Sequence, residues 1–203
     1  MRGHYSPNPL WTNEVWGLDP LHTDNDRYLT CSDDATLRLY SASQRKCIAI
    51  LPLDTDKKGK TLKRVKIKGF KGKGMNQKAV GRTVGISWDD KIIVVGMKDG
   101  TIWAIEANPK SKDLDMKRIK MWKPPKCDWI SDIKFSPDNK KVAIGSHNNK
   151  IYLYNTKSWK KCVRPMNKHS SYITHIDWSE DGSYLHSNCG AYEILFWNVH
   201  SGL

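Results

Sequence analysis

Four stretches of this 203-residue chain repeat one pattern of apolar and polar residues, and this repetition limits the fold more than any other feature. Each stretch has an alternating segment, a polar turn, an almost continuously apolar segment, a second polar turn and a third apolar segment. The third segments end at Tyr40, Ile105, Tyr154 and Trp197, so successive units lie 65, 49 and 43 residues apart. A repeat of this kind indicates one supersecondary unit per stretch.

The periodicity within each unit is that of β-strands. In the third unit Ile133 and Phe135 alternate with Asp132 and Lys134, the pattern of a strand with one buried face. Runs such as IIVVG and VAIGS are apolar throughout, and we expect them near the axis of the fold, where both faces are buried. Turns such as SPDN and SEDG separate the strands, with Pro or Asp at the first corner and Asn or Gly at the second. No useful helical stripe occurs, so the chain is predicted to be all-β.

Repeats of about 40–45 residues with four strands each are typical of β-propeller blades. We predict a partial WD40-like β-propeller of about four four-stranded antiparallel blades, the last incomplete. Fourth strands are expected at KCIAILPL, KRIKMW and KCVRPM. The blades are predicted at 13–53, 80–124, 128–167 and 169–203, after an N-terminal arm over 1–12.

An open ring of this size would leave strand edges unpaired. We therefore expect the chain to be part of a longer polypeptide, and the alternative is a half-propeller completed by a partner chain.

The net charge of +13 is concentrated in a basic insert at 57–82, between the first two units, which contains no Asp or Glu. Dense positive charge steers association with anionic partners and makes it sensitive to salt. We predict an arm that binds a polyanion, either acidic tubulin tails or nucleic acid. The alternative is a solvated segment with no specific partner. The candidate residues are Lys57, Lys58, Lys60, Lys63, Arg64, Lys66, Lys68, Lys71, Lys73, Lys78 and Arg82.

Aromatic residues give two further indications about partners. Phe70 is the only aromatic residue of the insert, which gives little support to base stacking and hence to nucleic acid. Trp122 and Trp159 lie at connections rather than in predicted core strands and are candidate rim anchors, since desolvated aromatic side chains dominate interface energies. Packing against a neighbouring blade is the preferred interpretation of both.

Other chemistries find no support in the residues. Gly59-Lys60-Thr61 lacks the P-loop glycine five residues earlier, where Asp54 stands. The seven histidines show no ligand spacing, so we predict neither a metal nor a cofactor. No catalytic arrangement is evident, and Asp33-Asp34 fits a strand-joining turn, so we do not expect an enzyme.

The five cysteines lack C-x-x-C spacing, the N-terminus lacks a secretion signal, and no apolar run reaches about 18 residues. Together these features predict reduced thiols, a cytoplasmic location and no membrane segment.

The units resemble WD repeats, which open on Gly-His and close on Trp-Asp. The opening histidine remains as His169, and the closing pairs include Tyr154-Asn155 and Trp197-Asn198. More specifically, the chain is similar to the echinoderm microtubule-associated-protein-like family. The similar segments are EVWGLDPLHTDNDRYLTCSDDATLRLY at 14–40, AIGSHNNKIYLY at 143–154, and HSSYITHIDWS with YEILFWN within 169–198.

This resemblance implies one of a pair of tandem propellers and association with microtubules. It favours tubulin over nucleic acid as the partner, and a cytoskeletal location with the cilium as a further setting. The leading hypothesis is a non-enzymatic, microtubule-associated scaffold propeller helped by its basic insert. The alternatives are a generic WD-repeat adaptor in a protein assembly and a nucleic-acid-associated propeller.

The resemblance also implies one local defect. Ala191 stands where the family usually has an Asp, whose carboxylate accepts a hydrogen bond from the opening histidine of the blade. We therefore expect His169 to lack its partner and the last blade to be less stable by about 1 kcal/mol, the usual net contribution of one hydrogen bond.

Overall fold

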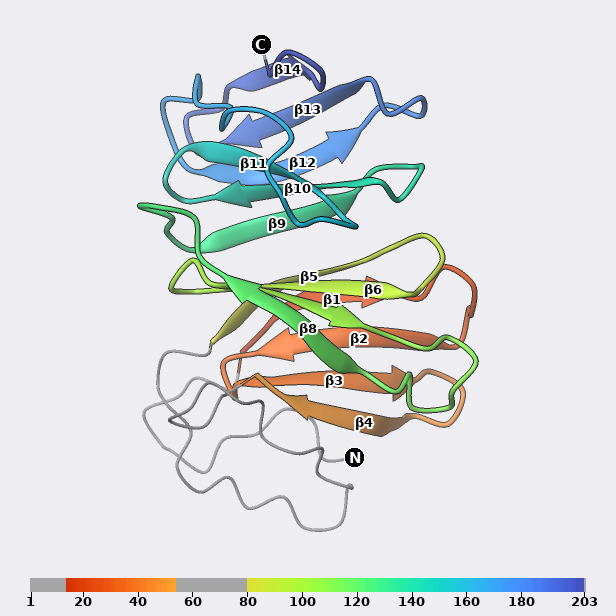
Figure 1. The fold of residues 1–203 in the computed structure, drawn as a ribbon. Helices are drawn as coiled ribbons and strands as arrows, with labels where there is room; N and C mark the ends of the chain where they lie inside the picture. Colours follow the sequence, from red (N-terminus) through yellow and green to blue (C-terminus); the bar gives the residue numbers. More distant parts are fainter. Residues whose placement is uncertain (1–13, 54–79, 203) are drawn as a thin grey trace.

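The computed structural model describes residues 14–53 and 80–202. The strands of these ranges form four antiparallel sheets, which lie one above another in Figure 1. Within the described ranges there is no helix of the length and apolarity needed to cross a membrane. The prediction of an all-β, partial propeller is confirmed.

Each sheet is one blade, and its strands follow one another in chain order. Blade 1 contains β1 (Val15–Pro20), β2 (Arg27–Ser32), β3 (Thr36–Ser41) and β4 (Lys46–Pro52). Blade 2 contains β5 (Gly81–Ile86), β6 (Ile92–Met97), β7 (Ile102–Glu106) and β8 (Lys117–Trp122). Blade 3 contains β9 (Ile130–Phe135), β10 (Lys141–Ser146) and β11 (Lys150–Asn155). Blade 4 contains β12 (Ile173–Trp178), β13 (Tyr184–Cys189) and β14 (Ile194–Asn198).

Blade 3 differs from the expected pattern because its fourth strand does not form. The KCVRPM segment makes two isolated bridges to β11, Tyr154 with Lys161 and Ile151 with Met166. Pro165 lies between these bridges and has no N–H to donate, so a continuous ladder of hydrogen bonds cannot run through the segment.

The innermost position of each blade belongs to its first strand, since β1, β5, β9 and β12 contact one another in succession. The expectation that runs such as IIVVG lie at the axis is therefore wrong. They form the second strand of a blade, next to the innermost one. These residues are apolar because the second strand is enclosed between two blades. Ile93 and Val95 of β6 join the core shared with blade 1, whereas Val94 joins the core shared with blade 3.

Glycines allow the innermost strands to approach closely. A Cβ atom on Gly85 would lie 2.8 Å from the carbonyl oxygen of Ile133 in β9. A Cβ atom on Gly17 would lie 2.8 Å from the backbone nitrogen of Val84 in β5. Because the obstructing atoms include backbone atoms of the next blade, the blades must separate to admit a side chain at either position.

Replacing Gly85 with alanine is expected to lower the free energy of unfolding by about 1–3 kcal/mol, the usual cost of overpacking. Urea denaturation of the two proteins measures the difference. Thr174→Ala, at an exposed position of the innermost strand β12, is the control and should stay within about 0.5 kcal/mol. Equal stability of Gly85→Ala and the parent would contradict the close approach of β5 and β9.

At one end of the propeller the same hydrogen bond occurs in every blade. The residue after the second strand donates its N–H to the carbonyl of the residue just before the first strand. The four pairs are Asp33 with Glu14 at 3.2 Å, Lys98 with Val80 at 2.8 Å, His147 with Trp129 at 2.8 Å, and Gly190 with Tyr172 at 2.9 Å. We call this the insert end, because Leu53 and Val80, which flank the segment outside the described residues, both lie there.

The opposite end, here the turn end, contains the predicted tight turns. The hydroxyls of Ser87, Ser136 and Ser179 donate to aspartates two residues later, at 2.7, 2.7 and 2.6 Å. Asn139 and Gly182 have φ angles of 59° and 69°, as the second corners of SPDN and SEDG require. Hydrogen bonds from Ser179 and Ser183 lower the pKa of Asp181 to about 2.

A titratable pair joins blade 3 to blade 4. Asp132 Oδ2 accepts the N–H of Ile176 at 2.9 Å and lies 2.8 Å from Nδ1 of His175. The hydrogen bond to Asp132 raises the pKa of His175 above its ordinary value, against a smaller lowering by burial. Lys134 and Asp177 also face the imidazole, with opposite effects on its pKa.

Because the folded-state pKa of His175 is raised, its contribution to stability is present below about pH 6.5 and is lost as the pH rises through the folded-state pKa. The His175 side chain is 53% exposed, so we expect at most about 1 kcal/mol. Unfolding of the parent and His175→Gln should therefore differ at pH 5.5 and converge at pH 8.5. His200→Gln, at an exposed position, is the control; a difference that grows with pH would contradict the assignment.

Candidate interaction surface

Ten of the eleven basic candidates, Lys57 through Lys78, lie outside the described residues, and for them the polyanion prediction stays a prediction. Arg82 is the exception. It lies inside β5, its side chain is 4% exposed, and it therefore cannot contact a macromolecular polyanion. Its assignment to the polyanion set is wrong, and the segment available for such binding ends before β5.

Arg82 instead joins three blades. Its Nη1 donates to Asp33 Oδ1 of blade 1 at 2.5 Å. Its guanidinium carbon lies 4.2 Å from the ring centroid of Trp16 and 4.4 Å from that of Trp129, next to blade 3. A buried charge needs such partners, and arginine is well suited because its planar cation stacks on aromatic faces. Burial lowers the pKa of Arg82, but a guanidinium stays charged.

The stacking continues across blade 3 to blade 4. Trp129 stacks on His147 with centroids 4.6 Å apart, and His147 lies 4.7 Å from Tyr172. Burial lowers the pKa of His147, which favours the neutral ring in this stack. We call Trp16, Arg82, Trp129, His147 and Tyr172 the aromatic ladder. Trp16 and Tyr172, at its two ends, are each 45% exposed, so the ladder reaches the surface at the insert end.

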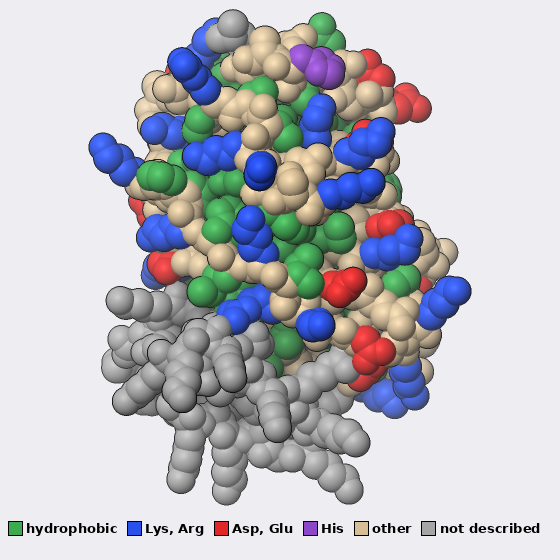
Figure 2. All heavy atoms as spheres, in the orientation of Figure 1, with side chains coloured by type: hydrophobic (Ala, Val, Ile, Leu, Met, Phe, Trp, Pro, Cys, Tyr) green, Lys and Arg blue, Asp and Glu red, His purple; other side chains and the backbone are tan. Residues whose placement is uncertain are grey.

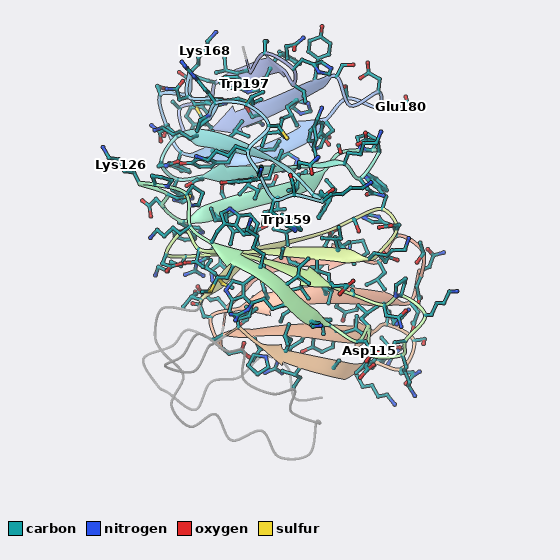
Figure 3. The ribbon with its side chains drawn as sticks, viewed as in Figure 1. Asp115, Lys126, Trp159, Lys168, Glu180 and Trp197 are labelled. Carbon is teal, nitrogen blue, oxygen red and sulfur yellow. The ribbon has the colours of Figure 1, made fainter. Side chains whose placement is uncertain are left out.

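Three exposed lysines, Lys98, Lys126 and Lys168, lie at the same end of the propeller. Lys98 lies with its Nζ 5.9 Å from the ring centroid of Trp129. In Figure 3, Lys126 and Lys168 project from the left edge of the molecule, whereas Asp115 and Glu180 lie at the right edge. Figure 2 likewise shows acidic side chains gathered mostly along the right side of the visible face. The insert end thus offers aromatic and cationic groups to a partner.

The two tryptophans considered as rim anchors fill the seam between blades 2 and 3, as the packing interpretation holds. The Trp122 ring lies 5.2 Å from Tyr154 and 5.4 Å from Trp159, between centroids. Trp159 is only 9% exposed and appears between the two blades in Figure 3. These rings contribute core area and leave little of themselves for a partner.

His169 does have the hydrogen-bond partner that Ala191 was expected to remove. Glu193 Oε2 lies 3.3 Å from His169 Nδ1 and also accepts the N–H of Ser170 at 2.9 Å. On the other side of the ring, His169 Nε2 lies 2.7 Å from Ser187 Oγ, which accepts the indole N–H of Trp197 at 2.8 Å. The expectation of a weakened blade is wrong because the longer carboxylate, two residues further on, reaches the same histidine.

The stacked antiparallel sheets of three or four strands and the His169–Ser187–Trp197 hydrogen bonds define this chain as a WD-repeat β-propeller. Residues 15–203 match the family described as the second β-propeller of echinoderm microtubule-associated protein. The chain belongs to that family, which confirms the resemblance seen in its segments.

Individual relatives agree with this membership. The chain is 31% identical over 190 residues to the ciliary WD repeat-containing protein ctxp80 of Euplotoides octocarinatus, covering 92% of this chain and 24% of the relative. It is 31% identical over 198 residues to echinoderm microtubule-associated protein-like 3 of Mus musculus, with coverages of 94% and 18%. It is 28% identical over 194 residues to the 77 kDa echinoderm microtubule-associated protein of Lytechinus variegatus, with coverages of 94% and 24%. The chain thus spans a quarter or less of the length of these relatives.

Proposed function

We propose that this chain is a non-enzymatic, microtubule-associated scaffold propeller whose basic segment, together with the insert end, binds acidic tubulin surface. The observation that carries the proposal is its membership of a family named for microtubule association. The relatives named above include a ciliary protein, so we propose a cytoskeletal location that includes cilia.

The two points at which the basic segment joins the propeller support this mechanism. Leu53 donates its N–H to Ala35 at 2.8 Å, and Val80 accepts the N–H of Lys98 at 2.8 Å, so both attachment points lie at the insert end. The charge of residues 57–78 is therefore attached beside the exposed lysines and the aromatic ladder. Tubulin tails rich in carboxylates would be attracted by the charge of this segment and by the exposed lysines. Salt would screen the attraction over about 8 Å at physiological ionic strength.

Co-sedimentation with microtubules tests the proposal. In one variant the ten basic residues of 57–78 become glutamine, and in a second Lys98, Lys126 and Lys168 become glutamine. We expect the first to weaken binding by at least about tenfold, because several ionic contacts are lost at once. The second should weaken binding less. A triple variant of Lys91, Lys110 and Lys140, which removes equal charge near the turn end, is the control and should bind like the parent.

The same experiment is repeated at different salt concentrations and with microtubules that lack the acidic tubulin tails. Binding by the parent should fall between 50 and 200 mM salt and after protease removes the acidic tubulin tails. Full binding by the ten-residue variant would overturn the role of the insert and support the adaptor hypothesis. Displacement of tubulin by nucleic acid would support the nucleic-acid alternative. A parent that never pellets would overturn the proposal.

A further inference from the structure

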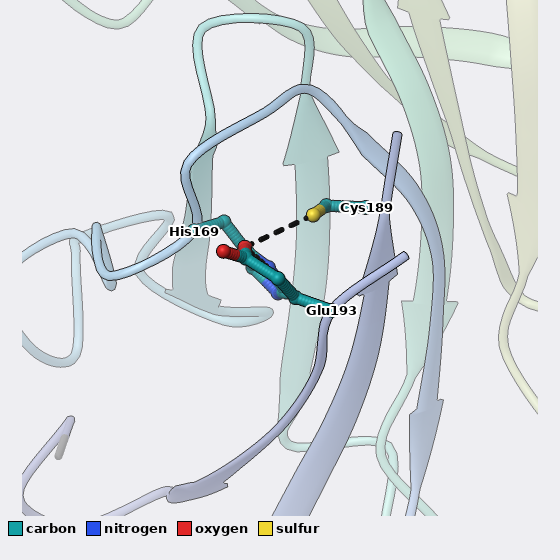
Figure 4. Close-up of side chains that lie close together, drawn as sticks. All are labelled: His169, Cys189 and Glu193. Atoms are coloured by element: carbon teal, nitrogen blue, oxygen red, sulfur yellow. Dashed lines mark hydrogen bonds and ion pairs between the residues drawn. The ribbon is translucent and has the colours of Figure 1, made fainter. Parts of the chain in front are cut away.

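We propose that His169, Cys189 and Glu193 form a binding site for a thiophilic divalent cation, with Zn²⁺ as the metal whose chemistry matches. His169 precedes β12, Cys189 ends β13, and Glu193 directly precedes β14. One nitrogen, one sulfur and one oxygen from these side chains all lie within 4.8 Å of one another. Figure 4 shows the three side chains converging on one point.

The donor distances are close to those of a tetrahedral zinc site. Zn–N and Zn–O bonds of about 2.0 Å and a Zn–S bond of about 2.3 Å require N···O and S···O separations of about 3.3 and 3.5 Å. His169 Nδ1 lies 3.3 Å from Glu193 Oε2, and Cys189 Sγ lies 3.1 Å from the same oxygen. The third pair, the histidine nitrogen and the Cys189 sulfur, lies within 4.8 Å, so binding requires rotation of these side chains.

Surrounding contacts orient two of the three ligands. Ser187 Oγ fixes the imidazole at Nε2, the kind of outer contact that positions metal-binding histidines. Ser170 donates its Oγ hydrogen to Glu193 Oε1 at 2.7 Å and its N–H to Oε2 at 2.9 Å, which holds Oε2 beside the histidine and the thiol. His169 and Cys189 are buried, whereas the Glu193 side chain is 35% exposed, so an ion can arrive from solvent and keep a water as fourth ligand.

Binding requires a defined movement of protons. Ligands bind a metal in their deprotonated form, so the Cys189 thiol releases its proton to solvent and His169 must present an unprotonated Nδ1. In that tautomer the ring proton is on Nε2, which donates to Ser187 Oγ, 2.7 Å away. One proton is thus released per cation, so affinity falls as the pH falls.

The donor set belongs to blade 4 alone among the described blades. The residues at the position of Cys189 in blades 1, 2 and 3 are Ser32, Met97 and Ser146, the last residues of β2, β6 and β10. Within residues 14–53 and 80–202 no other three His, Cys, Asp or Glu side chains converge in this way. Thiolate, imidazole and carboxylate together favour Zn²⁺ over Mg²⁺ or Ca²⁺, which prefer oxygen ligands alone.

Titration of the metal-free protein with Co²⁺ tests the site, because a cobalt–thiolate bond gives a charge-transfer absorption band. The parent should develop this band with one equivalent, and Zn²⁺ should abolish it. Cys189→Ser should lose the band and bind Zn²⁺ more than about 100-fold more weakly. A loss of this size exceeds the roughly 10- to 100-fold effect of mutating a residue that only contacts a ligand. Cys162→Ser, which removes an exposed cysteine, is the control and should keep the band.

Two further measurements separate loss of a ligand from loss of the fold. Serine already occupies the corresponding position in blades 1 and 3, so Cys189→Ser should keep the circular dichroism spectrum of the parent. Glu193→Gln should weaken Zn²⁺ binding as well, since it removes the anionic ligand. Absence of the band in the parent, or an equal band in Cys189→Ser, would overturn the proposal and leave the three side chains as a hydrogen-bond network only.

Discussion

Replacement of Arg82 by leucine is expected to lower the free energy of unfolding by about 3–5 kcal/mol, the usual cost of removing one partner of a buried ion pair. The leucine would remove the cation that faces Asp33 Oδ1 and lies over the rings of Trp16 and Trp129, which meet edge to face with centroids 5.5 Å apart. It cannot donate a hydrogen bond, and its branched side chain cannot reproduce a planar cation packed against two indoles. Urea denaturation, followed by tryptophan fluorescence, measures the loss.

The lysine variant of the same position separates charge from shape. Arg82→Lys keeps the positive charge but not the planar fork, so its loss should be intermediate. Lys98→Leu, near the same Trp129 ring but exposed, is the matched control and should change stability by no more than about 0.5 kcal/mol. If Arg82→Leu were as stable as this control, Arg82 would not be the structural residue described here.

Replacement of Trp197 by alanine is expected to cost about 3–5 kcal/mol, the range for deletion of a large buried aromatic side chain. Trp197 is 1% exposed and lies in the core shared by blades 3 and 4, together with Leu153 and Ile176. Its indole N–H donates to Ser187 Oγ, so the substitution also removes a hydrogen bond from the His169 network. Thermal and urea unfolding of the two proteins measure this loss.

The neighbouring residue offers a control on the opposite face of the same strand. Phe196 is 74% exposed, so Phe196→Ala should change the stability of this chain by no more than about 0.5 kcal/mol. Trp197→Phe keeps most of the ring but loses the hydrogen bond, and its cost should lie between the two. Equal effects of Trp197→Ala and Phe196→Ala would contradict the burial of the indole.

Most of the fold could be predicted from the sequence because local patterns determine it. The alternation in β9, the apolar β6 and the turns closed by Asn139 and Gly182 each require only neighbouring residues to be read. The position of β6 within its blade could not be read in this way. An enclosed second strand and an innermost strand both produce continuous apolar runs, and only the packing of whole blades distinguishes them.

The site was harder to predict because it depends on contacts between distant residues. Arg82 is continuous in sequence with a basic run, yet its partners Asp33 and Trp129 are 49 and 47 positions away. No local pattern indicates that this cation is buried. Glu193 could have been found, since a carboxylate two residues after Ala191 lies in the same turn. The side-chain length that lets it reach His169 is a property of the folded turn.

Leu53 and Gly81 lie next to each other, and this affects how the connection between them can change during evolution. A Cβ atom on Gly81 would lie 3.0 Å from Leu53 Cδ1, so the chain leaves and rejoins the propeller at nearly one point. The entropic cost of closing a loop rises by only about 0.6 kcal/mol for each doubling of its length. Lineages could therefore lengthen, shorten or recode this connection while the blades keep their sequence. The same point is where a protein engineer could graft a foreign domain onto the propeller without disturbing its blades.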